Sequence, residues 1–358
     1  MALRTPAVPE RLFGKGFLGF GEAYVSGELE IEGDLQELLR LGFGMGFDEN
    51  RSLREKIGLL PYYLKTKATV DRSRKNIARH YDLAPEFYSL FLDESLTYSC
   101  GYFRSQKDSL ALAQRQKYDL IARKLRLGQG DTILDIGCGY GGMLLRAVRQ
   151  CGAKGLGITL SKNQYGHVRG KIAEAGLEGV LEVKLLDYRD LVGKFDKVVS
   201  IGMFEHVGRR YIPVFMKQVA KLLKKGGTGL LHTIAKEVES PTDPWTLRYI
   251  FPGGYIPGLA ETLREMGRAG LCVLDVEPLR LHYARTLDRW IENFEKNAGK
   301  IAEMFGERFV RMWRLYLNSS SAGFKYWNTR VYQILFSNGL NNDLPAIRGY
   351  EDSAENVN

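Results

Sequence analysis

The spacing of apolar residues becomes regular after about residue 107. Residues 110–125 carry apolar side chains at helical spacing. Short apolar runs follow, at residues 132–139, 155–160, 181–187 and 195–204. Stretches with helical spacing lie between the first three runs, at 141–151 and 161–175. Strands that alternate with helices of this length are typical of βαβ units. The pattern therefore predicts an α/β fold with a mostly parallel sheet and helices on both faces.

The N-terminal residues follow a different pattern and predict a small separate α+β domain over residues 1–47. In "ELEIEGD", Leu29 and Ile31 would face inward from a short strand, because apolar and acidic residues alternate there. "DLQELLRLG" follows as a brief helix with Asp34 as its N-cap. Residues 48–75 are expected to form a basic linker, and residues 76–358 a large second domain.

The far C-terminal part also has helical spacing. From Thr286 to Phe336 apolar and aromatic residues recur at intervals that suit helices. We expect these helices to cap the pocket of the large domain, and the same helices could line a channel for a long apolar ligand.

Charge and cysteine content narrow the setting. The net charge of +9 suits either solubility or an anionic partner, a nucleic acid or an acidic membrane surface. Basic residues crowd the stretch 48–80, which is either a solvated linker or a strip for anionic groups. The four cysteines form no CxxC pair, so we expect no zinc site, no other metal, and free thiols in a reducing cytoplasm. No run is long and apolar enough for a membrane span.

The run "ILDIGCGYGG" ends a strand in Asp135 and continues into closely spaced glycines, which let a backbone approach a ligand. In a NAD site an acid would end the next strand, but here that strand ends in Thr159, followed by Leu160 and Gln164. NAD is therefore disfavoured. The pattern instead resembles motif I of the class I methyltransferases, which have a Rossmann-like fold and bind S-adenosylmethionine.

The resemblance to these methyltransferases also covers the third strand, where Asp187 stands at the place of an acid that reaches the adenine, with Tyr188 beside it. A surface turn is the alternative for Asp187. After the fourth strand, enzymes that methylate nucleic-acid nitrogens usually carry an Asn/Asp-Pro-Pro-Tyr/Phe turn. This chain has "SIGMFEHVG", with Glu205 as a candidate general base or holder of one. A nucleic-acid partner is therefore not expected.

Several long stretches together resemble the cyclopropane-fatty-acyl-phospholipid synthase family, which includes the mycolic acid cyclopropane synthases. They are "HYDLAPEFYSLFLDESLTYSCGYF", "LDIGCGYGG", "GITLSKNQ", "VSIGMFEHVG", "LLHTI", "YIFPGGYIP" and "LRLHYARTL". Residues 1–47 resemble the extra domain of the phospholipid-acting members, which the mycolic acid enzymes lack. The resemblance implies methylene transfer from S-adenosylmethionine to a cis double bond of a phospholipid acyl chain. It also suggests a homodimer that contacts the inner face of an anionic membrane peripherally.

The same resemblance implies a bound bicarbonate as base. Its holders here would be Cys100, Glu205, His232, the backbone N–H of Ile234, and Tyr283. The expected cofactor residues are Tyr98, Ser99, Asp135, Gly137, Gly139, Thr159, Leu160, Gln164, Asp187 and Tyr188. Aromatic candidates for stabilising a cation are Tyr81, Phe87, Tyr98, Tyr249, Phe251, Tyr255 and Tyr283.

Alternative interpretations stay open for individual residues and for the activity. Taken alone, Cys100 suits a nucleophile, half of a disulfide, a metal ligand or a small buried hydrophobe. His232 suits a core histidine, and Tyr283 a tyrosine on the face of a strand. The alternative activities are a fatty-acyl methyltransferase with a methyl-branched or methylene product, a small-amine N-methyltransferase, and a lipid-binding protein without catalysis.

Overall fold

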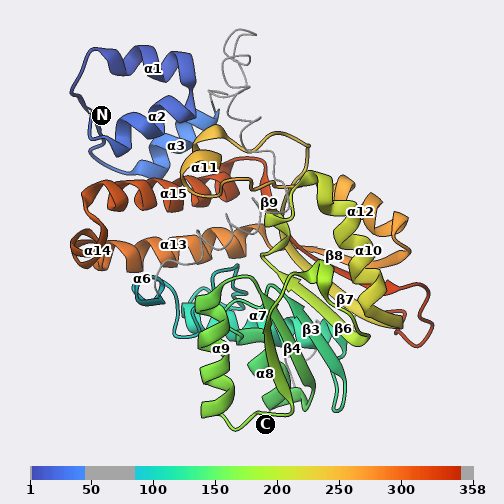
Figure 1. The fold of residues 1–358 in the computed structure, drawn as a ribbon. Helices are drawn as coiled ribbons and strands as arrows, with labels where there is room; N and C mark the ends of the chain where they lie inside the picture. Colours follow the sequence, from blue (N-terminus) through green and yellow to red (C-terminus); the bar gives the residue numbers. More distant parts are fainter. Residues whose placement is uncertain (1, 45–84, 348–358) are drawn as a thin grey trace.

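The computed structural model describes residues 2–44 and 85–347. Its centre is a seven-stranded sheet in the order β5-β4-β3-β6-β7-β9-β8 (Figure 1). The first five strands in this order are parallel, whereas β9 runs antiparallel to both of its neighbours. The strands are β3 (Thr132–Ile136), β4 (Lys154–Thr159), β5 (Leu181–Leu185), β6 (Phe195–Ile201), β7 (Leu223–Lys236), β8 (Leu271–Pro278) and β9 (Thr329–Asn338). The predicted α/β fold with a mostly parallel sheet is confirmed.

Helices cover both faces of this sheet, and each face has its own apolar core. On one face Leu144, Val168 and Ile121 pack against strand residues such as Ile133. On the other face Phe215 packs with residues such as Leu134. The helices of the first face are α7 (Leu110–Leu125), α8 (Gly142–Cys151) and α9 (Lys162–Glu174), and those of the second are α10 (Ile212–Leu222) and α12 (Leu259–Arg268).

Local signals in the sequence account for where these helices begin. Ser109 caps α7, because its side chain accepts a hydrogen bond from the Leu112 amide, 3.2 Å away. Ser161 caps α9 in the same way through the Gln164 amide, at 3.3 Å. α9 thus begins directly after the carboxyl end of β4, and ligands of such folds bind at this edge of the sheet.

The N-terminal segment consists of a two-stranded sheet and three helices. They are β1 (Ala2–Leu3), β2 (Leu29–Glu30), α1 (Ala7–Lys15), α2 (Phe17–Val25) and α3 (Leu35–Gly44). Leu29 is buried as expected, and Asp34 accepts a hydrogen bond of 2.7 Å from the Gln36 amide at the start of α3. The predicted basic linker 48–75 lies outside the described residues.

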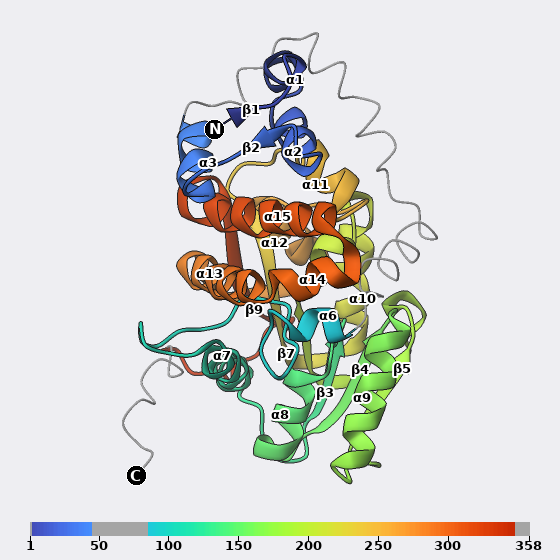
Figure 2. The same cartoon turned by 90° about the vertical axis from the view of Figure 1, so that its left-hand side faces the viewer.

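The C-terminal helices lie between this segment and the sheet. They are α13 (Arg280–Lys296), α14 (Ala298–Phe305) and α15 (Glu307–Tyr326). Figures 1 and 2 show α15 between α13 and the N-terminal helices, with α11 (Pro244–Tyr249) beside α2. Leu18, Trp245, Trp290 and Trp313 belong to one apolar core that spans both parts. The boundary at residue 47 stays a prediction, but the described residues on its two sides share this core.

One expectation for the C-terminal part is wrong, and one alternative is excluded. The helical spacing does not continue to Phe336, because residues from Thr329 onward form β9, whose backbone pairs with both β7 and β8. Tyr283 does not lie on the face of a strand, because it belongs to the first turn of α13. Hydrogen bonds to strands far away in the sequence decide the first case over local periodicity.

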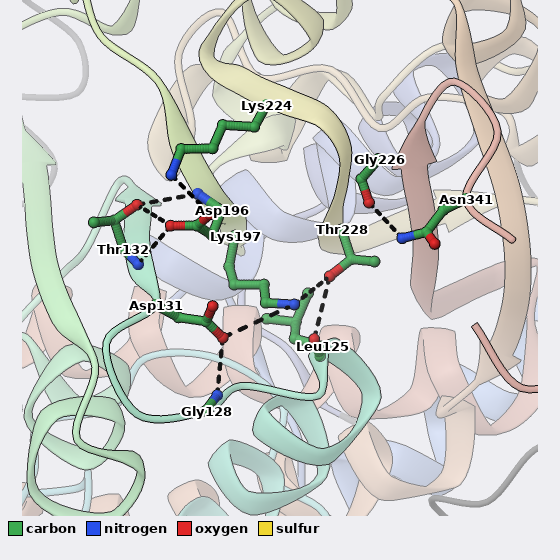
Figure 3. A network of polar contacts seen from close by, with 10 residues as sticks. All are labelled: Leu125, Gly128, Asp131, Thr132, Asp196, Lys197, Lys224, Gly226, Thr228 and Asn341. Atoms are coloured by element: carbon green, nitrogen blue, oxygen red, sulfur yellow. Dashed lines mark hydrogen bonds and ion pairs between the residues drawn. The ribbon is translucent and has the colours of Figure 1, made fainter. Parts of the chain in front are cut away.

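At the edge of the sheet opposite the carboxyl ends of the parallel strands, a polar network connects the amino ends of three strands (Figure 3). The Asp196 carboxylate accepts hydrogen bonds from the Thr132 amide at 3.0 Å, the Thr132 hydroxyl at 2.6 Å and the Lys224 ammonium at 2.8 Å. Burial alone would raise the pKa of Asp196, but the hydrogen bonds from Lys224 and Thr132 outweigh it and lower the pKa to about 2. Asp196 thus ties β3 and β6 to the start of β7.

We expect Asp196→Asn to lower the free energy of unfolding at neutral pH by about 1–2 kcal/mol, because a carboxylate with three donors is lost. The folded-state pKa lies below the ordinary value, so this stabilisation is present at neutral pH and disappears as pH falls toward 2. Urea denaturation at neutral pH and near pH 3 measures it, with the exposed Asp343→Asn as control. An equal free energy of unfolding for wild type and variant at neutral pH would contradict this role.

Candidate active site

Two cavities lie side by side at the carboxyl edge of the parallel strands. All ten residues predicted to bind the cofactor line the first cavity: Tyr98, Ser99, Asp135, Gly137, Gly139, Thr159, Leu160, Gln164, Asp187 and Tyr188. All five predicted holders of a base line the second cavity: Cys100, Glu205, His232, Ile234 and Tyr283. Four residues, Tyr98, Ser99, Gly202 and His206, line both cavities. We call these four the dividing wall.

The turn after β3 forms the floor of the first cavity. Gly137 and Gly139 have φ angles of 80° and 54°, which side chains rarely allow. A Cβ atom on Gly137 would lie 2.5 Å from Cγ of Met203, which also lines the cavity. Asp135, at the end of β3, is 2% exposed and its Oδ1 atom has no hydrogen-bond partner in the described part of the chain. Burial raises the pKa of Asp135 to about 7, although Lys117 opposes this.

The ends of β4 and β5 supply the other side of the first cavity. The Thr159 hydroxyl donates to Gln164 Oε1 at 2.7 Å, which fixes the amide of Gln164 without a carboxylate at this position. Asp187 is buried, so it is not a surface turn residue. Its carboxylate accepts hydrogen bonds from Arg189, from the backbone amide at 3.0 Å and from Nε at 2.8 Å.

Glu205 and His232 are the polar centre of the second cavity. Glu205 Oε1 accepts a hydrogen bond of 2.6 Å from the Ile234 amide, whereas its buried Oε2 has no partner among the described residues. Burial raises the pKa of Glu205 to about 7. His232 Nδ1 lies 3.4 Å from Gln333 Nε2, and its buried Nε2 has no partner within the described ranges. Burial also lowers the pKa of His232 well below its ordinary value, so the ring is neutral.

Two of the predicted holders are already engaged. The Ile234 amide donates to Glu205 instead of facing an open position. The Cys100 thiol donates to the carbonyl oxygens of Gly101, at 3.2 Å, and Leu279, at 3.9 Å. Burial raises the pKa of Cys100, so the thiol stays protonated, and it forms no disulfide. The structure therefore favours a buried hydrogen-bonding thiol over a nucleophile.

Aromatic side chains surround the dividing wall. The Tyr98 ring stacks on Trp290 with centroids 5.1 Å apart, and its hydroxyl lies 2.7 Å from that of Tyr316. Tyr283 packs against Phe324, with centroids 4.6 Å apart. Of the other aromatic candidates, Phe251 and Tyr255 line the second cavity, Phe87 and Tyr249 line neither cavity, and Tyr81 lies outside the described residues.

Four site residues have no place in the sequence-based prediction of the site. His206 stands beside Glu205 in the predicted stretch and was available as a candidate. Tyr316 lies in a helix that was expected to cover the pocket. Lys117 donates to the hydroxyl of Ser99, and Gln333 lies beside the ring of His232. Only the packing of elements far apart in the sequence brings these residues together.

Across residues 2–44 and 85–347 we find no cluster of His, Cys, Asp or Glu suited to a metal ion. None of the helices in these ranges has the length and apolar character needed to cross a bilayer.

Comparison with known proteins decides the family. The sequence model of the family described as "Mycolic acid cyclopropane synthetase" matches residues 68–334. The chain belongs to this family. It is 40% identical to a probable fatty acid methyltransferase of Pseudomonas putida, over 92% of this chain and 85% of that protein. It is 33% identical to the cyclopropane-fatty-acyl-phospholipid synthase of Escherichia coli, over 97% of this chain and 90% of that protein.

Among solved structures, the chain is similar to mycolic acid cyclopropane synthase CmaA1 complexed with SAH and CTAB. The TM-score is 0.71 at 33% identity, over 74% of this chain and 98% of that chain. The class I methyltransferase fold expected from the sequence is thereby confirmed, and this family member is an S-adenosylmethionine-dependent methyltransferase. All ten residues that the sequence predicts to bind this cosubstrate line the first cavity.

Proposed function

We propose that this enzyme transfers a methylene group from S-adenosylmethionine to the cis double bond of an unsaturated phospholipid acyl chain, and so forms a cyclopropane ring. The observation that carries the proposal is the second cavity. It shares four lining residues with the first cavity and has aromatic sides. It also holds the carboxyl group of Glu205, one oxygen of which has no partner among the described residues. An alkene has no acidic proton to lose before it attacks a methyl group, so such a site needs a base only after the methyl has moved.

The side chains of the second cavity suit this order of events. The π electrons of the alkene form the new bond to carbon, and the electron pair of the sulfur–carbon bond stays on sulfur. The positive charge then lies on the acyl chain, where the faces of aromatic rings such as Tyr98 and Tyr283 stabilise it by about 2 kcal/mol each in a dry site. Loss of a proton from the new methyl group closes the ring. Water must be kept from the cation until then, and the aromatic and apolar side chains that line the cavity favour this.

A bicarbonate ion fits the polar centre of this cavity. Glu205 Oε2 and His232 Nε2 are both buried and unpaired among the described residues, and an ion with a shared proton can bond to a carboxylate and to a neutral imidazole at once. Tyr283 would be a third residue in contact with the ion. Cys100 and the Ile234 amide would not contact it, because they already donate to the Gly101 carbonyl and to Glu205. When bound, bicarbonate would supply a base for the proton of the new methyl group. The raised pKa of Glu205 suits a carboxyl group that shares a proton.

The N-terminal segment supports a phospholipid as substrate. The alignment with the E. coli phospholipid enzyme covers 97% of this chain, whereas the mycolic acid synthase structure covers 74%. The N-terminal segment packs against α15 and α11. These two helices contribute Tyr316 and Thr246 to the second cavity. A segment at this position can help to present a lipid to the cavity. We further propose that the enzyme is a homodimer in the cytoplasm and contacts the membrane peripherally.

For the membrane contact, we expect binding to anionic phospholipid vesicles to weaken about tenfold or more when salt rises from about 0.05 to about 0.5 M, because salt screens charge attraction. Vesicle sedimentation measures it, with zwitterionic vesicles as control. Binding that does not depend on salt concentration would show that basic residues do not make the contact with the membrane.

A second candidate function is a fatty-acyl methyltransferase with a methyl-branched or methylene product. It is favoured by the 40% identity to the Pseudomonas putida protein. The same cation would give it, by a hydride shift before proton loss. Small-amine N-methylation is the weaker alternative, since coclaurine N-methyltransferase shares the fold at 20% identity.

The proposal is tested by comparing substrates in one assay. Formation of SAH is measured with unsaturated phospholipid vesicles, with the same lipids fully saturated, with free unsaturated fatty acid and with small amines. Of these four substrates, we expect only the unsaturated phospholipid to give turnover. Turnover with an amine or with the saturated lipid would refute the proposal.

A further inference from the structure

Lys117 is a buried lysine that the proposed reaction does not use. It lies on α7 with 0% of its surface exposed. Its Nζ donates to Ser99 Oγ at 2.8 Å and to Gln114 Oε1 at 2.9 Å, and it lies 4.3 Å from the centroid of the Tyr118 ring. No ion pair in the described ranges includes it. A buried ammonium without a paired carboxylate is costly, so its position calls for a reason.

Lys117 and its neighbours on α7 hold the segment that contributes Tyr98 and Ser99 to the dividing wall. Gln114 Nε2 donates to the Ser99 carbonyl at 2.9 Å, so the carbonyl and the hydroxyl of Ser99 are both bonded to this helix. One turn further, the Tyr118 hydroxyl lies 2.8 Å from that of Thr97. This arrangement makes Lys117 a positioning residue for Ser99.

The dividing wall is also where the charge of the cosubstrate must lie. A methyl group that passes from the first cavity to the second crosses the residues that line both, and Ser99 is one of them. In S-adenosylmethionine that methyl is bonded to a positively charged sulfur, whereas the sulfur of SAH is neutral. The ammonium of Lys117 stands one hydrogen bond behind Ser99. Two positive charges separated by about one side chain inside a protein, here the ammonium of Lys117 and the sulfonium of the cosubstrate, repel each other measurably.

We propose that Lys117, besides positioning Ser99, sets the preference of the enzyme between S-adenosylmethionine and SAH through its own charge. Protonated Lys117 weakens binding of the cationic cosubstrate relative to the neutral product, and neutral Lys117 does not. The inference rests on the methyltransferase activity and not on the identity of the lipid, so binding measurements test it separately.

Lys117 is one of two neighbouring groups, with Asp135, whose charge can change near neutral pH. Burial lowers the pKa of Lys117 to about 7. The titratable groups that act on it or face it are Asp93, Cys100, Tyr118, Asp135 and His232. Burial keeps Cys100 and Tyr118 protonated and His232 neutral, because it disfavours their charged forms. Asp135 changes charge in the same range, with the same sign of effect, so a variant must separate the two.

The test is the ratio of the dissociation constants of S-adenosylmethionine and SAH, measured by calorimetry on the full-length enzyme from about pH 6 to about pH 9. In the wild type we expect the ratio to fall about fivefold or more as pH rises. Lys117→Met and Lys117→Arg should both lose the part of the pH dependence that Lys117 causes and keep only the smaller part that Asp135 causes. The ratio should stay closer to the high-pH value in Lys117→Met and closer to the low-pH value in Lys117→Arg, whose side chain stays charged. Gln114→Met removes the other hold on Ser99 without changing charge, and should keep the wild-type pH dependence. Full wild-type pH dependence in Lys117→Met would overturn the proposal.

Two further measurements keep the proposal testable if Lys117→Met fails to fold. Lys117→Gln retains an N–H donor for Ser99 and should also reduce the pH dependence of the ratio to the part that Asp135 causes. In the wild type, calorimetry in buffers of different ionisation enthalpy counts the protons released on binding. More protons should leave with S-adenosylmethionine than with SAH near pH 7, because the cation disfavours protonated Lys117. Equal release for the two ligands would overturn the proposal.

Discussion

Replacing Glu205 by Gln is expected to lower kcat by about 10²–10⁴-fold while the dissociation constant of S-adenosylmethionine changes by no more than a few-fold. Gln can still accept the hydrogen bond from the Ile234 amide. The atom at the position of Oε2 becomes an NH₂ group, which cannot hold or share a proton as a carboxyl group does. The loss should therefore fall on turnover and leave the first cavity as it is.

Single-turnover kinetics and calorimetry measure the two parts of this Glu205 prediction. Glu178→Gln makes the same chemical change on the surface and serves as control. Turnover of Glu205→Gln at the wild-type rate would remove Glu205 from the reaction. Equal losses in turnover and in cosubstrate affinity would assign it a structural role.

Gly137→Ala is expected to weaken S-adenosylmethionine binding by about 10- to 100-fold. Two costs add: the φ of 80° is unfavourable for a residue with a Cβ, and that atom would meet Met203 at 2.5 Å. Because Met203 lines the same cavity, its displacement narrows the space for the cosubstrate. The effect should appear in affinity more than in the thermal stability of the ligand-free enzyme.

The matched control for Gly137→Ala is Gly170→Ala, an exposed position inside α9 where an added Cβ meets nothing within 4 Å. It should bind S-adenosylmethionine as the wild type does and be slightly more stable, because Ala favours a helix. Unchanged affinity in Gly137→Ala would mean that the cosubstrate does not rest against this turn.

The cosubstrate side of the site was largely predictable from sequence, because it depends on local features. The glycine turn after Asp135 and the helix that begins near Ser161 are each set by neighbouring residues, and both occur as expected. The missing acid after β4 was also informative, since the amide of Gln164 occupies that place with a hydrogen bond from Thr159.

The second cavity depends on contacts that no local pattern shows. Gln333 reaches His232 because β9 pairs with β7, and the helical spacing expected as far as Phe336 concealed that strand. The bond between the Ile234 amide and Glu205 depends on the approach of two chain segments at the end of β7. Resemblance named Glu205, His232 and Ile234 but not Gln333, and only the fold shows which hydrogen-bonding groups of these residues remain open in the described part of the chain.

The central claim is that the methylene group becomes part of a ring in the acyl chain. Its most direct test is the structure of the product after incubation of the enzyme with unsaturated phospholipid vesicles and S-adenosylmethionine labelled in the methyl group with ¹³C. We expect mass spectrometry and NMR to show a fatty acid that has gained one CH₂, no longer contains the double bond, and carries the label in a cyclopropane ring. A label in a branched methyl group, in an exocyclic methylene group or on the headgroup nitrogen would contradict the account.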